Sequence, residues 1–356
     1  MPVLYGIAAA TTALVVTALL AMLLRLPALR FGIVDRRRQR PLPLLGGVAV
    51  ALVTCLVAAA GEWTRFAPLG SEIGRLLIAA GAVACLGLVA DVRRVKARFL
   101  VGGTAVAAAC VVPYGDTGIL LGLVAVGWIV LVAVGFKALD HADALVGTVG
   151  VLTAFGVGIC AAAEVMDELA VLLSVLAAAL TGFLMHNWHP ARIGLGATGS
   201  LFVGFVLAAS AVMTRAGLDP VSSVSVLYSL TALATADVVL VALSRRLAGR
   251  PLLRRGPDHL AHRLRRTGLT PQGVTVLLGV GTFCGVLVGV LVHMGWMARS
   301  GAFWVAAVAL IAVFALLHIK TYGPRRQPNF PVQDSARASD RVASSQVGAP
   351  LRVRNG

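Results

Sequence analysis

Charged residues are scarce in this 356-residue sequence: they make up 13% of it, whereas hydrophobic residues make up 58%. A soluble globular chain has about a quarter of its residues charged, so this composition excludes that class. The alternating pattern of membrane-spanning β-strands is also missing. The sequence has instead repeated apolar runs of roughly 18 or more residues, which are typical of transmembrane helices. We therefore expect an all-α, polytopic integral membrane protein.

Acidic residues are half as frequent as basic ones, 15 against 31, which gives a net charge of +16. A surplus of this kind can indicate a nucleic-acid partner. Here, however, the arginines lie between the apolar runs and in the C-terminal tail, as the positive-inside rule predicts. Anionic lipid headgroups are the usual partners of such loops, so we expect a membrane partner and no nucleic acid. The five cysteines lie inside apolar runs without metal-ligand spacing, which indicates packing residues.

Eleven apolar runs are candidate membrane spans, and some of them are short enough to be tilted or partly interfacial. They lie at about 3–24, 44–61, 75–90, 99–114, 117–136, 148–165, 169–186, 198–214, 223–244, 273–295 and 302–319. The odd-numbered connections between them carry most of the basic residues, and the even-numbered ones carry acidic residues such as Glu62 and Asp167. This asymmetry predicts an N-terminus outside and a cytoplasmic C-terminus.

The two ends of the chain differ in character. The first run lacks a preceding basic segment and a small-residue cleavage site, so we interpret it as a retained helix rather than a signal peptide. Residues 322–356 are basic and rich in Ser, Pro and Arg, which predicts a disordered cytoplasmic tail. The domains expected are therefore a transmembrane unit, 1–321, and this tail.

Two connections predicted on the cytoplasmic side contain unusual residues near a span. The first runs from Asp35 through an arginine cluster to Pro43-Leu-Leu-Gly46-Gly47. Paired glycines allow a close backbone approach, either to another helix or to a phosphate. The second contains Asp91 at the end of an apolar run. An ionisable group there is a functional candidate, and the alternative is an ion pair with Arg94 or a neighbouring arginine.

A third connection, Phe136-Lys-Ala-Leu-Asp-His-Ala-Asp-Ala-Leu-Val-Gly147, concentrates polar groups between two long apolar runs. Lys137, Asp140, His141 and Asp143 fall within seven residues. Two carboxylates beside a lysine and a histidine can hold a phosphate or a metal-bound phosphate. The alternative is a short solvated loop between two helices.

Two further connections contain glycine and histidine motifs. Gly196-Ala-Thr-Gly-Ser200 directly precedes an apolar run. A helix N-terminus of this kind favours an anion, although a simple helix cap by Thr198 or Ser200 fits the same pattern. In the last connection, His259 and His262 are spaced to share one face of a helical turn. We interpret the pair as an anion site because eight arginines lie nearby, and the alternative is a basic interfacial helix.

Taken in order, these connections resemble one family, the polyprenyl-phosphate N-acetylhexosamine-1-phosphate transferases. The most specific matches are Asn187-x-x-Pro-Ala-Arg-Ile193, Gly196-x-Thr-Gly-Ser-Leu-Phe202 and Pro257-Asp-His-x-x-His-Arg-Leu264. The resemblance covers about residues 30 to 270. It implies a bacterial, multi-pass plasma-membrane enzyme of cell-envelope glycan biosynthesis, which transfers a sugar-1-phosphate from a UDP-sugar to a polyprenyl phosphate with Mg²⁺. A homodimer is one assembly compatible with it.

The resemblance also implies roles for particular residues. The catalytic residues expected are Asp91 and Asp143. The metal ligand expected is Asp143, and Asp140, which is new relative to the family, is expected to substitute for a lost ligand. The substrate-binding residues expected are Lys137, Asn187, Gly199, Ser200, His259 and His262.

The chain departs from the family pattern at four polar positions, which are here Ala90, Val146, Ala197 and Ala261. The family has aspartates at the first three positions, one of them a metal ligand at position 197, and a histidine at the fourth. Loss of a carboxylate weakens a Mg²⁺ site in affinity and geometry. Two hypotheses follow: a transferase with a rearranged site, or a non-catalytic member that binds a lipid phosphate, a nucleotide sugar or an assembly partner. A transporter is less consistent, because intramembrane charge is sparse and Asp237 is its main candidate.

Overall fold

The computed structural model describes residues 2–35, 41–64, 70–93, 95–251, 256 and 258–319. The predicted tail, 322–356, the arginine run, 36–40, and Arg94 lie outside the described residues. The expectations attached to these segments therefore stay predictions.

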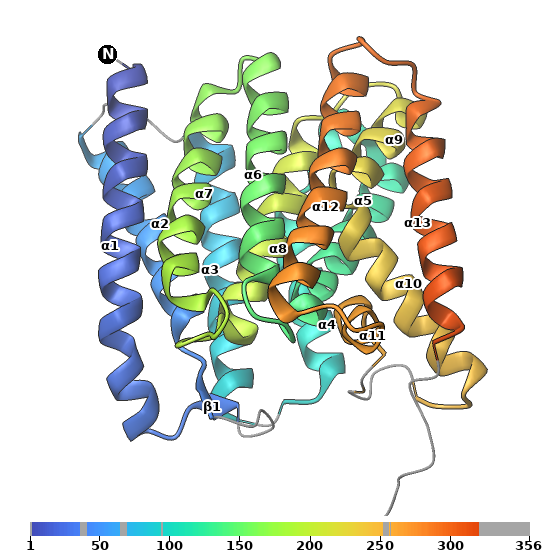
Figure 1. Cartoon of the computed structure of the whole chain (residues 1–356). Helices are drawn as coiled ribbons and strands as arrows, with labels where there is room; N and C mark the ends of the chain where they lie inside the picture. The colour runs from blue at the N-terminus through green and yellow to red at the C-terminus, as the bar shows by residue number, and fades with distance from the viewer. Residues whose placement is uncertain are drawn as a thin grey trace, which may run out of the picture. The chain divides into compact units, whose positions relative to one another are not determined.

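The described part of the chain is a bundle of thirteen helices with one short two-stranded antiparallel sheet (Figure 1). The first half contains α1 (Pro2–Arg30), β1 (Val34–Asp35), β2 (Leu42–Pro43), α2 (Gly46–Thr64), α3 (Gly70–Val92), α4 (Ala97–Val111), α5 (Tyr114–Leu139) and α6 (Leu145–Ala163). The second half contains α7 (Asp167–Asn187), α8 (Gly196–Met213), α9 (Pro220–Leu230), α10 (Ala232–Leu247), α11 (Leu260–Arg266), α12 (Pro271–His293) and α13 (Gly301–Leu317).

Eight helices of the described chain are long and apolar enough to cross a membrane, and α9 with α10 make a ninth if they form one broken span. The two remaining apolar helices, α4 and α13, are shorter. Each range expected from the sequence falls on a helix, except that the range 223–244 falls on both α9 and α10. The all-α polytopic membrane class is confirmed, and the count of eleven spans stays a prediction.

The chain bends by 80° between α9 and α10, where the sequence predicted one continuous helix. Thr231 leaves the helical conformation there, with φ −120° and ψ 16°. The Thr153 hydroxyl of α6 donates to the carbonyl of Leu230 at 3.4 Å, which satisfies a backbone group at the break. Such breaks are tolerated within a membrane when neighbouring side chains take over the lost hydrogen bonds. Hydropathy alone does not reveal this tertiary contact.

Helix α8 is the centre of the bundle, because all of its residues are buried. It packs against α2, α3, α5 and α6. Glycines allow the close approaches: a Cβ at Gly87 of α3 would lie 2.6 Å from the Cα of Thr198, and one at Gly204 would lie 2.8 Å from the Cα of Ala133 in α5. These glycines thereby bring α3 close to the first turn of α8 and α5 close to its middle.

The glycine pair at the start of α2 makes the approach to another helix rather than an exposed turn. Gly46 and Gly47 donate their amides to the carbonyls of Gly194 and Leu195, at 3.1 and 2.9 Å. A Cβ at Gly47 would lie 2.2 Å from the amide nitrogen of Gly199. Of the two uses that the sequence left open, helix contact is therefore the one observed.

Candidate functional site

Asp91, at the end of α3, caps the N-terminus of α8. Its carboxylate accepts hydrogen bonds from the amides of Ala197 and Thr198, at 2.8 and 2.9 Å, and from the Thr198 hydroxyl at 2.8 Å. A carboxylate is stabilised there by the unpaired amides and by the helix dipole. The partner of Asp91 is thus a helix terminus. The Gly196–Ser200 turn, which the sequence suggested as a phosphate site, already binds the Asp91 carboxylate.

Gly199 and Ser200, the other residues expected to contact substrate in this turn, are buried. The Ser200 hydroxyl donates to the carbonyl of Gly196 at 2.6 Å, and Gly199 lies against Gly47. Both residues shape the turn, and their contact with substrate stays a prediction.

Lys137 lies in the last turn of α5, where its positive charge acts on the Asp91 carboxylate. The preceding residue, Phe136, packs against Gly204, so the backbone that carries Lys137 is held beside α8. A cation is also favourable at the C-terminal end of a helix. The structure therefore brings Lys137 and Asp91 into one site, although 46 positions separate them in the sequence.

Asn187, at the end of α7, joins two loops of this site. Its side-chain oxygen accepts from the amide of Ala144 at 2.8 Å, and its side-chain nitrogen donates to the carbonyl of Ile193 at 2.7 Å. Ala144 precedes α6 and has a φ of +60°, a conformation that costs energy for a residue other than glycine. Asn187 is buried and holds this strained turn in place.

Asp143 belongs to the same turn and is oriented by the opposite loop. Its Oδ2 accepts from His189 Nδ1 at 2.8 Å and from the amide of Ala191 at 3.2 Å. Its backbone carbonyl accepts from the Thr275 hydroxyl of α12 at 3.0 Å. Sequence reasoning missed His189, although it lies inside the Asn187-x-x-Pro motif. Asp140, the second expected metal ligand, follows directly after α5.

Three histidines from two loops form a cluster, which we call the histidine cluster: His141, His259 and His262. The ring of His141 lies 4.4 Å from that of His259 and 4.6 Å from that of His262, measured between centroids. His141 donates from Nδ1 to the carbonyl of Ala138, which leaves Nε2 buried without a hydrogen-bond partner. The expected pair is therefore brought together, and His141 of the third connection joins it.

Protonation of the histidine cluster is disfavoured at two of its members. Burial lowers the pKa of His141 to about 3, and the neighbouring His259 acts in the same direction. Burial also lowers the pKa of His262, followed in size by the charges of His259 and Arg265. Both imidazoles are thus neutral near pH 7 and become charged more readily when an anion is near.

Buried acids hold the loop that carries His259 and His262. Asp237 of α10 accepts from His259 Nδ1 and from the amide of Leu260, both at 2.8 Å. Asp258 accepts from the Arg245 side chain at 3.0 Å. Asp237, which the sequence singled out only for a transport role, is therefore a partner of the histidine cluster.

Arg263 of α11 fixes the end of the last helix. Its guanidinium donates to the carbonyls of Leu316 and Ile319, at 2.7 and 2.9 Å, and to the Ser244 hydroxyl at 2.5 Å. The side chain is buried. Sequence reasoning assigned it no role beyond the motif, because its partners are backbone carbonyls more than 50 residues away.

The donor groups of this site do not fit a divalent cation. The described residues contain no group of three or more His, Cys, Asp or Glu side chains arranged to hold a metal ion. Asp91 points its oxygens at the N-terminus of α8, and Asp143 points one at His189. A methyl group occupies position 197, next to Asp91. Among the described residues, these side chains therefore do not form a converging set of three or more ligands.

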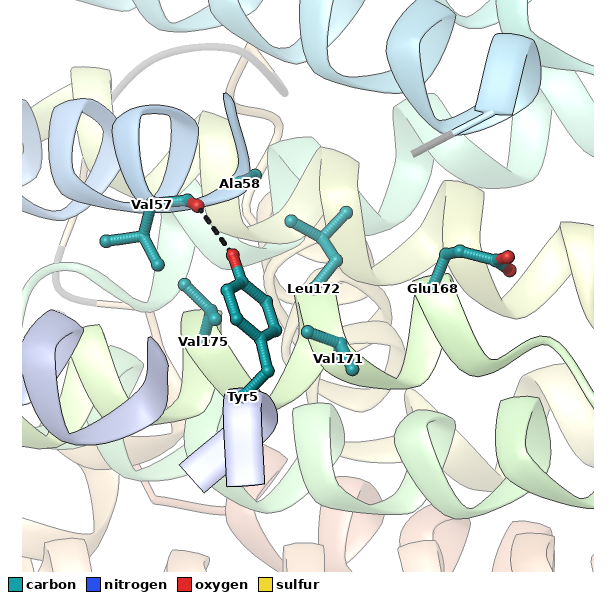
Figure 2. A pocket seen from close by; sticks show the side chains of 7 residues that line it. All are labelled: Tyr5, Val57, Ala58, Glu168, Val171, Leu172 and Val175. Atoms are coloured by element: carbon teal, nitrogen blue, oxygen red, sulfur yellow. Dashed lines mark hydrogen bonds between the residues drawn. The ribbon is translucent and has the colours of Figure 1, made fainter. Parts of the chain in front are cut away.

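An apolar cleft lies at the other end of the bundle, between α1, α2 and α7 (Figure 2). Tyr5 donates its hydroxyl there to the carbonyl of Val57 at 3.4 Å. Glu168 points away from Tyr5 (Figure 2). The remaining lining residues are aliphatic, so this cleft carries no group suited to phosphate chemistry.

Comparison with known proteins agrees with the motifs that meet at this site. Residues 74–215 match the model of glycosyl transferase family 4. A provisionally named glycosyltransferase of Streptomyces coelicolor is 62% identical over 330 residues, which cover 92% of this chain and 80% of that protein. The decaprenyl-phosphate N-acetylglucosaminephosphotransferase of Mycolicibacterium smegmatis is 29% identical over 75% of this chain and 77% of its own. The phospho-N-acetylmuramoyl-pentapeptide-transferase of Moorella thermoacetica is 38% identical over 34% of this chain and 36% of its own.

The strong relative spans most of both chains, and the family model covers the stretch that runs from α3 through α8. That stretch contains Asp91, Lys137, Asp143 and Asn187. This multi-pass membrane protein, with bacterial relatives, belongs to glycosyl transferase family 4, of the polyprenyl-phosphate N-acetylhexosamine-1-phosphate transferase type.

Proposed function

We propose that the chain transfers a phospho-N-acetylhexosamine from a UDP-sugar to a polyprenyl phosphate. The observation that carries the proposal is that motifs from distant connections, each of which resembles the family, meet at one end of the bundle. Asp91 meets the Thr198 turn, Asn187 meets the Ala144 turn, and His141 meets His259. Family membership supports the reaction type. The Mycolicibacterium smegmatis relative is named for transfer of phospho-N-acetylglucosamine to decaprenyl phosphate, and the Moorella thermoacetica relative for transfer of phospho-N-acetylmuramoyl-pentapeptide.

The proposal includes a topology with eleven spans, an external N-terminus and a cytoplasmic site. The site end of the bundle carries Arg30, Lys96, Arg98, Lys137, Arg192, Arg245 and Arg246, at or next to helix ends. The opposite end carries Glu62, Glu72, Asp116, Glu164, Asp167, Glu168 and Asp219, with fewer arginines. The positive-inside rule favours a cytoplasmic location for the first group. A soluble nucleotide sugar and a lipid phosphate can meet at that interface. Assembly as a homodimer belongs to the proposal as well.

The chain's own residues account for much of what phosphoryl-type transfer needs, which is positioning and charge neutralisation. Asp237 accepts from His259 Nδ1, which fixes the orientation of the ring and leaves Nε2 for contact with a phosphate oxygen. His189 and the amide of Ala191 orient the Asp143 carboxylate, the candidate for contact with the acceptor. The family typically depends on Mg²⁺ for charge neutralisation, and the described carboxylates of this chain do not converge to hold that ion.

A non-catalytic binding protein is the second candidate, and the donor groups favour it. The described carboxylates do not converge as a metal-dependent transferase would require. Such a protein would still bind a UDP-sugar or a polyprenyl phosphate at the same face. The two candidates differ in turnover, not in ligand.

Release of UMP by the purified full-length chain, measured over a panel of UDP-sugars with polyprenyl phosphate present, tests the proposal. We expect release that depends on the lipid phosphate and falls to background in Asp143→Asn. Saturable UDP-sugar binding without UMP release across the panel would contradict the transferase and support the binding protein.

A further inference from the structure

The aspartate that the family resemblance implies at position 197 is an alanine here, and the nearby Asp91 carboxylate already accepts hydrogen bonds from the chain itself. Asp91 Oδ1 accepts from the amide of Ala197, and its Oδ2 accepts from the amide and the hydroxyl of Thr198. The residue at position 197 therefore lies directly against Asp91, yet its side chain is a methyl group. A second carboxylate there would create the like-charge pair that draws in a divalent cation.

A positive charge from α5 acts on the same carboxylate. Lys137 lies in the last turn of α5, which packs along α8 through Phe136 and Gly204, and its charge acts on Asp91. Lysine is a compact point charge that binds phosphate without needing a geometric set of ligands. Unlike a bound ion, it needs no converging carboxylates.

We propose that Lys137, rather than a divalent cation, supplies the positive charge that binds the substrate phosphate beside Asp91 and the N-terminus of α8. This inference rests on the proposed function and deepens it by naming the source of charge. The ligand is a phosphate oxyanion, either the diphosphate of the nucleotide sugar or the phosphate of the lipid.

The first experiment measures binding of UDP-N-acetylglucosamine to the detergent-purified full-length chain by calorimetry, once with EDTA and once with excess Mg²⁺. We expect dissociation constants that agree within about threefold, and a loss of about tenfold or more in Lys137→Met with EDTA present. Lys96→Met is the matched control, because Lys96 is an exposed lysine on the same face, and it should bind as the parent does. Binding that requires Mg²⁺, or an unchanged affinity in Lys137→Met, would overturn the inference.

The same titration with a polyprenyl phosphate in mixed micelles identifies which phosphate Lys137 holds. Loss of affinity in Lys137→Met for the nucleotide sugar alone assigns Lys137 to the diphosphate, and loss for the lipid alone assigns it to the lipid phosphate. Either result supports the inference, and affinity unchanged for both ligands contradicts it.

A second experiment builds the missing ligand. In Ala197→Asp, a carboxylate would lie beside Asp91, so we expect Mg²⁺ to raise the melting temperature of this variant through ligand-linked stabilisation. Ala197→Asn has nearly the same volume without the charge and should show no Mg²⁺ response. The unmodified chain should also show none, and a Mg²⁺-dependent rise in its melting temperature would overturn the inference.

The two proposals fail in distinguishable ways. If UDP-sugars and polyprenyl phosphate bind under neither condition, the proposed function falls and takes the inference with it. If they bind only with Mg²⁺, the proposed function survives and Lys137 does not replace the cation.

Discussion

Substitution of Asn187 by alanine tests how the site is held together. Asn187 is 6% exposed and makes two hydrogen bonds, one to the amide of Ala144 and one to the carbonyl of Ile193. Alanine removes both and leaves the two backbone groups buried. The turn that carries Asp143 and the loop that carries His189 thereby lose the link that Asn187 provides between them.

The expected magnitude follows from these two groups. Each buried backbone group left without a partner costs about 1–3 kcal/mol, so Asn187→Ala should lower the free energy of unfolding by about 2–6 kcal/mol. The positive φ of Ala144 adds to the effect, because the hydrogen bond that compensates this strained conformation is lost.

The assay is SDS-driven unfolding of the purified chain in mixed micelles, followed by tryptophan fluorescence. Asn187→Asp keeps the acceptor for Ala144 but sets a buried carboxylate oxygen against the carbonyl of Ile193, so it should destabilise the chain at least as much. Unfolding of Asn187→Ala within about 0.5 kcal/mol of the parent, the range of an ordinary surface substitution, would refute the reasoning.

Three further predictions concern packing, a buried cation and pH. Gly47→Ala should destabilise the chain by about 1–3 kcal/mol in the same unfolding assay, because its Cβ would lie 2.2 Å from a backbone nitrogen of α8. Gly81→Ala is the control: its Cβ would meet open space, so the substitution should be neutral or slightly stabilising. Arg263→Met should lower the free energy of unfolding by about 2–4 kcal/mol and speed hydrogen exchange at the end of α13, because it leaves the carbonyls there without their donor. Arg265 is exposed, so Arg265→Met should change neither quantity. Because folding lowers the pKa of His262, the unfolded chain takes up its proton first, so its contribution to stability is present above about pH 6.5 and is lost as the pH falls below that value. The melting temperature of His262→Gln should therefore fall less on acidification than that of the parent, and an equal fall would contradict this assignment.

The membrane class and the helices could be predicted from sequence because hydropathy is a local signal. The bend at Thr231 could not, because it depends on a hydroxyl from α6 and on glycines of α12 that approach Ser229 and Leu230. Neither partner is near Thr231 in the sequence. The count of eleven spans depends on α4 and α13, which are shorter than the eight helices that are long enough to cross a membrane.

The site was predictable as a set of residues and less so as a set of contacts. The motifs predicted that Asp91, Asp143 and His259 belong to one site, because they occur in the same order along the chain as in the family that the sequence resembles. An arginine partner was one of two readings of Asp91, and its observed partner is the N-terminus of α8. Backbone amides carry no residue-specific signal, so a sequence cannot reveal such a partner.

In the histidine cluster, the structure adds a residue that the sequence motif did not include. The sequence showed one histidine fewer in the last connection than the family has, and the structure adds His141 from the third connection. Residue 261, where the family has a histidine, is an alanine buried in the core. The number of histidines in a motif therefore does not give the number in the site.

Transfer of a labelled sugar-phosphate to lipid tests the central proposal most directly. The purified chain is incubated with UDP-N-acetylglucosamine labelled in the sugar and with a polyprenyl phosphate, and the label in the lipid extract is counted. The account predicts lipid-linked label in step with UMP release, and none with Asp143→Asn. An extract without label, for this sugar and for the other UDP-sugars of the panel, would contradict it.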